Sequence, residues 1–238
     1  MTQTDFYTIL PLTVLTAWAC LLLLADLFIP KDRKGITAFL SALGLAVTLG
    51  LTITQLGREN IGFNNMVVVD GFSTFINVIL LASGLLGIAL AYGYIKRMGL
   101  ERGEYYTLML FSVTGMMLMA QAADLIIVFL ALELLSIPLY VLAAFARPNL
   151  QSEEAGVKYF LLGAFSTGFV VYGTALIYGA TGTTSLGGIF FAASNGTPGL
   201  LLTIGAALLL AMRCSGPTFR TSSIRRSTST PMPSATAL

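Results

Sequence analysis

The 238-residue sequence contains no histidine and only two cysteines, Cys20 and Cys214, which lie far apart in the chain. Zinc sites, histidine-ligated haem and cysteine-ligated iron–sulfur clusters each need several such ligands, so none of these sites is supported. No glycine-rich loop follows a strand pattern, so a nucleotide site is unsupported as well. Any redox chemistry that this protein serves is therefore expected to take place elsewhere, and no cofactor is expected in this chain.

Charge is also scarce, because only 10% of the residues are charged whereas 56% are hydrophobic. The mean hydropathy is +0.85, and a soluble domain carries about 25% charged residues. The composition therefore predicts an integral membrane protein of the all-α class, a polytopic bundle of transmembrane helices. The net charge of +2 says little about partners, because the positions of the charges matter more.

Hydropathy predicts about six full spans and a short seventh. The expected spans are residues 8–29, 35–56, 72–95, 105–121, 125–146, 155–180 and 199–212. Residues 122–124 leave room for only a tight turn, so the fourth and fifth spans should be antiparallel neighbours. Residues 57–71 and 181–198 are expected to be polar connections. The seventh span covers about 21 Å, too short to cross a core of about 30 Å without tilt or polar extension.

Residues 213–238 break the pattern, because they are rich in serine, threonine and proline and show no periodicity. They are expected to form a disordered basic tail. The abrupt change near Met212 leaves a second interpretation open, in which the reading frame fails there. Sequencing the locus would distinguish the two.

The cations predict the orientation in the membrane. Alternating spans place seven of them on one side and only Arg58 on the other; the seven are Lys31, Arg33, Lys34, Lys96, Arg97, Arg102 and Arg147. By the positive-inside rule the side with seven is cytoplasmic and the N-terminus is outside. The first span lacks a convincing cleavage site and is expected to be retained.

Glu133 is the main candidate for chemistry, because it lies near the middle of an apolar span. A charged side chain at that depth costs at least about 2.5 kcal/mol and normally faces a bundle interior, a water-filled path or a charge partner. Pro138, five residues on, leaves the Leu134 carbonyl without its helical partner. Two interpretations stay open: a neutral glutamic acid beside a kink that only shapes packing, or a site of proton transfer.

Lys158, about three residues inside the sixth span, is the second candidate. Its depth differs from that of Glu133 by roughly 15 Å, which favours two stations linked by water over one salt bridge. Snorkelling to the interface explains its position equally well. Glu104 is a weaker candidate, best explained as a solvated acid at a helix start. Asp26, near the end of the first span, is either a solvated or capped terminus or a functional group.

Three segments resemble a known family. They are VVVDGFSTFIN at Val67–Asn77, YYTLMLFSVTGMMLMAQAADLIIVFLALELLSIPLYVLAAF at Tyr105–Phe145, and EEAGVKYFLLGAFSTGFVVYGTALIYGATGTT at Glu153–Thr184. They resemble subunit N of the proton-pumping NADH-quinone oxidoreductase, respiratory complex I, whose mitochondrial counterpart is NADH dehydrogenase subunit 2. The resemblance covers most of residues 1–212 and is most specific in the central hundred.

The resemblance implies a proton-translocating, antiporter-like subunit of the membrane arm, built from two inverted repeats of helices. It implies that Glu133 is a proton-channel residue and that Lys158 takes part in proton transfer. NADH, FMN, iron–sulfur clusters and quinone reduction then belong to other membrane-arm and peripheral-arm subunits, which are the implied partners. The enzyme would be an NADH:quinone oxidoreductase in the bacterial inner membrane, with this chain as a non-redox subunit.

The sequence departs from the family after residue 212. There the family's seventh helix continues with a buried lysine, followed by a PFH-type motif and the second repeat, whereas this chain has Arg213, Cys214, Ser215 and the tail. The chain thus holds roughly half of the family architecture. Two alternatives stay open: a subunit of a multi-subunit cation/proton antiporter, and a non-functional truncated copy.

Overall fold

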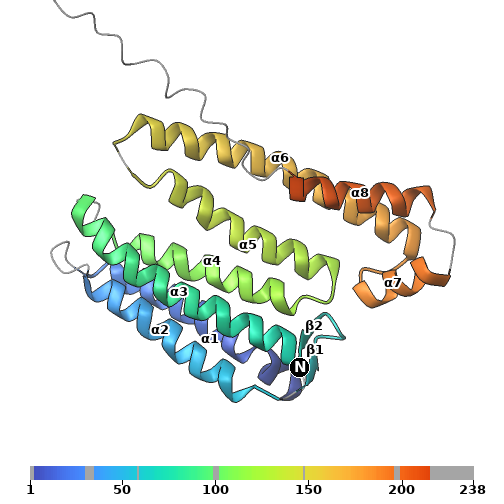
Figure 1. Ribbon diagram of the computed structural model, residues 1–238, viewed down its shortest axis with the longest axis horizontal. Coiled ribbons are helices and arrows are strands. Elements are labelled where there is room, and N and C mark those ends of the chain that lie inside the picture. Colours follow the sequence, from blue (N-terminus) through green and yellow to red (C-terminus); the bar gives the residue numbers. More distant parts are fainter. Residues whose placement is uncertain are drawn as a thin grey trace, which may run out of the picture.

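The computed structural model describes residues 3–29, 35–57, 59–98, 102–146, 148–195 and 199–214. Within these ranges it has eight helices and one two-stranded hairpin (Figure 1). Their bounds are α1 (Gln3–Asp26), α2 (Gly35–Thr54), β1 (Asn60–Gly62), β2 (Val67–Val69), α3 (Gly71–Met98), α4 (Glu104–Gln121), α5 (Leu125–Ala143), α6 (Leu150–Thr181), α7 (Leu186–Asn195) and α8 (Leu200–Cys214). Five of the described helices, α1, α2, α3, α5 and α6, are long and apolar enough to cross a membrane. The predicted all-α membrane bundle is confirmed.

The long helices run side by side, so their connections gather at two ends (Figure 1). We call one the cation-rich end, where α1, α3 and α5 finish and where Lys96, Arg97 and Arg102 lie. We call the other the hairpin end, which holds β1, β2, the α4–α5 turn, α7 and the beginning of α1. The remaining loop cations of the orientation argument and the predicted tail beyond residue 214 lie outside the described residues.

Helices α1 to α4 form a bundle with an apolar centre. Its core is made of fully or almost fully buried side chains from all four helices, among them Leu15, Leu45, Leu81, Leu110 and Met117. The single tryptophan, Trp18, donates a hydrogen bond from Nε1 to the Leu40 carbonyl oxygen at 2.9 Å. Its ring occupies the space that a side chain at Gly44 would need, so this glycine allows α1 and α2 to approach closely.

Pro11 lies inside α1 and cannot donate a backbone hydrogen bond to the Tyr7 carbonyl oxygen. The side chain of Gln55, just after α2, supplies the missing donor, because its Nε2 lies 2.6 Å from that oxygen. The helix therefore continues through the proline, and α2 is fastened to α1 at the hairpin end.

The hairpin end is tied together by short extended segments. β1 and β2 pair antiparallel, and isolated bridges join Val67 to Ala122 and Asp124 to Ser185. The Asp124 carboxylate caps α5 by accepting from the Ile126 N–H at 2.8 Å, and it also accepts from the Thr184 hydroxyl at 2.6 Å. The α4–α5 turn is therefore held between the hairpin and the α6–α7 connection.

The start of α3 is capped by Asp70, whose carboxylate accepts from the Ser73 N–H at 2.7 Å. The hydrogen bond from the backbone N–H of Ser73 is the main reason that the pKa of Asp70 lies below its ordinary value, and the hydrogen bond with the Ser73 hydroxyl lowers it further. An ionised cap at this position also interacts favourably with the helix dipole.

Several predicted elements differ from the structure. The first predicted span is 8–29, whereas α1 is Gln3–Asp26, and α8 extends to Cys214, two residues into the predicted tail. The predicted sixth span starts at residue 155, whereas α6 starts at Leu150, because Asn149 caps it and Glu153 suits the first turn of a helix. The predicted connection 181–198 contains α7, whose first turn begins from the Ser185 carbonyl. The predicted connection 57–71 contains the hairpin.

Asp26 is not solvated, because only 7% of its surface is exposed. Its carboxylate accepts from the Thr37 hydroxyl at 2.7 Å and lies directly against Gly103. Asp26 therefore joins α1, α2 and the start of α4 at the cation-rich end.

Candidate functional site

Glu133 lies near the middle of α5, half-buried and facing α6. Its Oε1 accepts a hydrogen bond from the Thr167 hydroxyl at 2.8 Å. The same hydroxyl lies 3.1 Å from the Gly163 carbonyl oxygen one turn away in α6. The carboxylate therefore has a neutral hydrogen-bond donor from the neighbouring helix at mid-depth.

The α5 backbone beside Glu133 lacks one helical hydrogen bond and packs closely against α4. Pro138 is buried inside α5 and removes the helical partner of the Leu134 carbonyl. α4 packs directly on the α5 backbone at this point, because a Cβ placed on Gly115 would lie 2.5 Å from the Leu135 nitrogen and 2.9 Å from the Leu134 carbonyl carbon. The absence of a side chain at Gly115 thus allows α4 to pack on the backbone of α5 next to the acid.

A line of hydroxyl groups leads from Glu133 toward the cation-rich end. Tyr140 follows Ser136 by one turn of α5, and its hydroxyl lies against Gly163 of α6. The Tyr140 and Tyr159 rings meet edge to face at 4.8 Å. We call this set, consisting of Glu133, Ser136, Tyr140, Tyr159 and Thr167, the α5–α6 seam.

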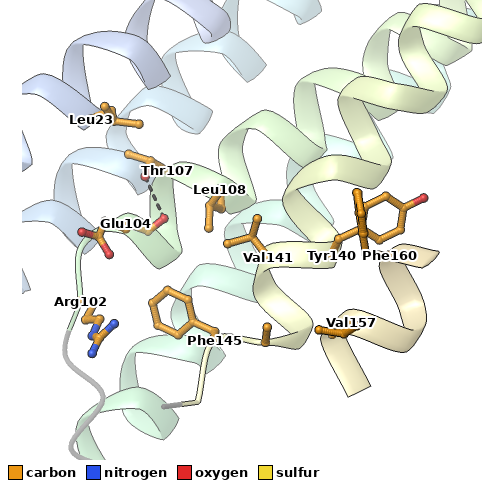
Figure 2. Close-up of a pocket in the computed structure, with 12 residues that line it drawn as sticks. Leu23, Arg102, Glu104, Thr107, Leu108, Tyr140, Val141, Phe145, Val157 and Phe160 are labelled. Atoms are coloured by element: carbon orange, nitrogen blue, oxygen red, sulfur yellow. Dashed lines mark hydrogen bonds between the residues drawn. The ribbon is translucent and has the colours of Figure 1, made fainter. Parts of the chain in front are cut away.

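A pocket of about 540 Å³ opens at the cation-rich end of the seam (Figure 2). Tyr140 and Val141 of α5 and Phe160 of α6 line one side, and Arg102 and Glu104 line the other. Glu104 is exposed in the first turn of α4, as expected for a helix-start acid. Tyr140 belongs to both the pocket and the seam, so the pocket reaches from the surface of the bundle to the hydroxyl groups of the seam.

Lys158 does not join Glu133. Its ammonium group pairs with the Glu154 carboxylate one turn earlier in α6, and the two side chains are 54% and 64% exposed. Nine residues separate Lys158 from Thr167, which is about 13.5 Å along a helix. The two predicted stations therefore lie at different depths, with Tyr159 and Tyr140 between them.

Sequence reasoning identified Glu133 and Pro138 but missed Thr167 and Tyr140. A signal was present, because Tyr159, Gly163 and Thr167 recur at four-residue spacing and so share one face of a helix. Among the described residues, no group of three histidine, cysteine, aspartate or glutamate side chains is placed to hold a metal ion.

Comparison with known proteins identifies the family and the fold. Residues 122–217 match the family described as NADH:quinone oxidoreductase/Mrp antiporter, transmembrane. NADH-quinone oxidoreductase subunit N of Chloroflexus aggregans is 46% identical over 211 residues, which are 87% of this chain and 43% of that protein. The chain thus spans just over two fifths of the length of this curated relative.

Solved structures share the fold. A chain of respiratory complex I from Thermus thermophilus with bound aureothin matches with a TM-score of 0.69 and 33% identity, over 85% of this chain and 42% of that one. A chain of the Mrp complex from Dietzia sp. DQ12-45-1b matches with a TM-score of 0.68 and 20% identity, over 89% and 40%. Within the length that it spans, this chain therefore belongs to the antiporter-like family of membrane subunits that includes NADH-quinone oxidoreductase subunit N.

Proposed function

We propose that this chain forms part of a proton-translocating membrane-arm subunit of an NADH-quinone oxidoreductase. The observation that carries the proposal is the half-buried Glu133 carboxylate, hydrogen-bonded to Thr167 at mid-depth beside the Pro138 break. Intramembrane acids that face a partner helix indicate a functional site by default, and proton relays are one of the established kinds. The 46% identity to a subunit N supports the assignment to this enzyme.

Thr167 lets Glu133 gain and lose a proton without parting the helices. When Glu133 is ionised, the hydroxyl donates to Oε1 at 2.8 Å. When Glu133 is protonated, its new O–H donates to the Thr167 oxygen, and the Thr167 hydrogen turns to the Gly163 carbonyl at 3.1 Å. A single hydroxyl with two acceptors therefore satisfies both charge states.

Protons reach Glu133 from the cation-rich end through the pocket and the hydroxyl groups of the seam. Tyr140 lines the pocket and lies one turn beyond Ser136 in α5, so the hydroxyl groups of these two residues form the proposed route between the pocket and the Glu133 carboxylate. Moving one charge against the membrane field needs about 2.3 kcal/mol per 100 mV, so this movement must be driven by a downhill reaction. We assign that reaction to partner subunits that hold NADH, FMN, iron–sulfur clusters and quinone, and no redox site to this chain.

Lys158 is proposed as a second station nearer the cation-rich end, where Glu154 holds its ammonium group. The cation-rich end is proposed to face the cytoplasm of a bacterial cell, with the chain in the inner membrane and the N-terminus outside. The cations Lys96, Arg97 and Arg102 support this orientation.

A cation/proton antiporter subunit is the alternative. The Dietzia neighbour shares the fold at 20% identity, which does not favour its transport activity over that of complex I. Membrane vesicles from a strain that lacks its own subunit N, with and without this chain, distinguish the two, after a native gel has tested assembly. We expect the chain to support NADH-driven proton uptake in sodium-free buffer. Uptake that requires sodium would favour the antiporter, and failure to assemble would indicate a non-functional copy.

A further inference from the structure

The core of the α1–α4 bundle becomes polar toward the hairpin end, as it also does at the cation-rich end around Asp26, Thr37 and Thr107. In each helix the buried face that carries leucine or methionine in the centre carries hydroxyl or amide side chains near that end. We call this set the polar layer; it consists of Thr8, Thr48, Thr52, Gln55, Thr74, Asn77 and Gln121, none more than 8% exposed.

Close contacts show that part of this layer lies at one depth. Gly84 of α3 faces Leu45 of α2 and Val113 of α4, because a Cβ on Gly84 would contact both side chains at 3.1 to 3.3 Å. Asn77 and Thr52 each lie seven residues from this contact toward the hairpin end, and Gln121 lies eight residues from it. These steps are about 10.5 and 12 Å of helix, so the three side chains sit at nearly the same level.

Several polar atoms of the layer have partners within the protein. Thr48 and Thr52 donate to carbonyls of their own helix at 2.8 Å, and Gln55 donates to Tyr7. Four buried atoms have no hydrogen-bond partner within the described part of the chain: Thr74 Oγ1, Asn77 Oδ1, Asn77 Nδ2 and Gln121 Oε1. Such atoms are rare in folded proteins, and a bound water or ion is one of the recognised explanations for them.

The chemistry of these atoms selects the ligand. Three oxygens would suit a cation, but the Asn77 amide nitrogen is a donor that a cation cannot satisfy. Water both donates and accepts, and a buried water typically makes about three hydrogen bonds to such groups. We propose that ordered water binds in the polar layer and bridges Asn77 to Thr74 and Gln121. This site lies between α3 and α4 and does not include the α5–α6 seam, so its failure would leave the proposed function standing.

Two variants of the same chemical change test the site. Thr74→Val removes an unpartnered hydroxyl, whereas the control Thr48→Val removes a hydroxyl that is bonded within its own helix. Unfolding of the purified chain in nanodiscs is followed by the fluorescence of Trp18, which lies in this bundle. We expect Thr74→Val to lower the melting temperature by about 2–4 °C more than the control does. A melting temperature that rises with Thr74→Val would show a dry layer and overturn the proposal.

Two measurements on the unaltered chain complete the test. Replacing sodium by choline should leave the melting temperature unchanged, and a sodium-dependent increase would show a cation site instead. A density map that resolves water should show peaks within hydrogen-bonding distance of both Asn77 Oδ1 and Asn77 Nδ2. A map with ordered water elsewhere in the protein but none at Asn77 would refute the site even if the variants do not fold.

Discussion

Replacing Gly115 by alanine should force α4 away from α5 beside Glu133. The new Cβ would lie 2.5 Å from the Leu135 nitrogen, whereas ordinary contact begins at 3.4 Å. The helices must therefore separate by about 0.9 Å, the difference between these two distances, because backbone atoms cannot rotate away. Overpacking of this kind costs about 1–3 kcal/mol.

Gly50→Ala is the matched control, since a Cβ there meets nothing within 4 Å. Both variants gain the helix propensity of alanine, up to about 1 kcal/mol, so the difference between them isolates the contact. We expect Gly115→Ala to melt about 2–12 °C below Gly50→Ala in circular dichroism, using about 2–4 °C per kcal/mol. Equal melting temperatures would refute the inferred packing of α4 on α5.

Three further predictions concern single hydrogen bonds. Thr167→Val should lower NADH-driven proton uptake severalfold. The control Thr174→Val removes a hydroxyl that bonds only within α6 and should leave uptake unchanged. Equal uptake by the two variants would contradict the role of Thr167. Hydrogen bonds at the start of α3 lower the pKa of Asp70, so its stabilising effect should be complete above about pH 4 and lost as the pH falls through that lowered pKa. The melting temperature of the Asp70→Asn variant should therefore change less with pH across this range than that of the unaltered chain. Gln55→Leu should lower the free energy of unfolding by about 1–3 kcal/mol, measured by chemical denaturation. In a Pro11→Ala background, where the backbone donor is restored, the same change should cost clearly less. Equal costs in the two backgrounds would show that Gln55 does not replace the missing backbone donor.

Hydropathy was sufficient to predict the long helices, because spans of apolar residues must satisfy their backbone internally. Hydropathy did not predict the polar first turn of α6 or the short helix α7. Glu153 belongs to α6 although it is charged, because its position in the first turn is favourable. α7 is short and glycine-containing, and it depends on hydrogen bonds from Leu186 to Ala123 and from Ile189 to Ser185 that join distant or capping segments.

The candidate site was predictable only in part. Glu133 stood out because an acid in an apolar span is expensive, whereas Thr167 and Tyr140 are ordinary residues in such helices. Their importance depends on the register between α5 and α6, which places the Thr167 hydroxyl 2.8 Å from the carboxylate. That register comes from packing at Gly163 against Tyr140, and sequence periodicity alone does not fix it.

The number of protons taken up per NADH oxidised is the most direct test of the claim that Glu133 carries protons. The comparison uses Glu133→Gln and, as a control with the same change of chemistry, Glu59→Gln, whose side chain is exposed in the connection before β1. Assembly is checked first on a native gel. The account predicts that Glu133→Gln assembles and lowers the ratio while Glu59→Gln leaves it unchanged. An unchanged ratio in an assembled Glu133→Gln complex would contradict it.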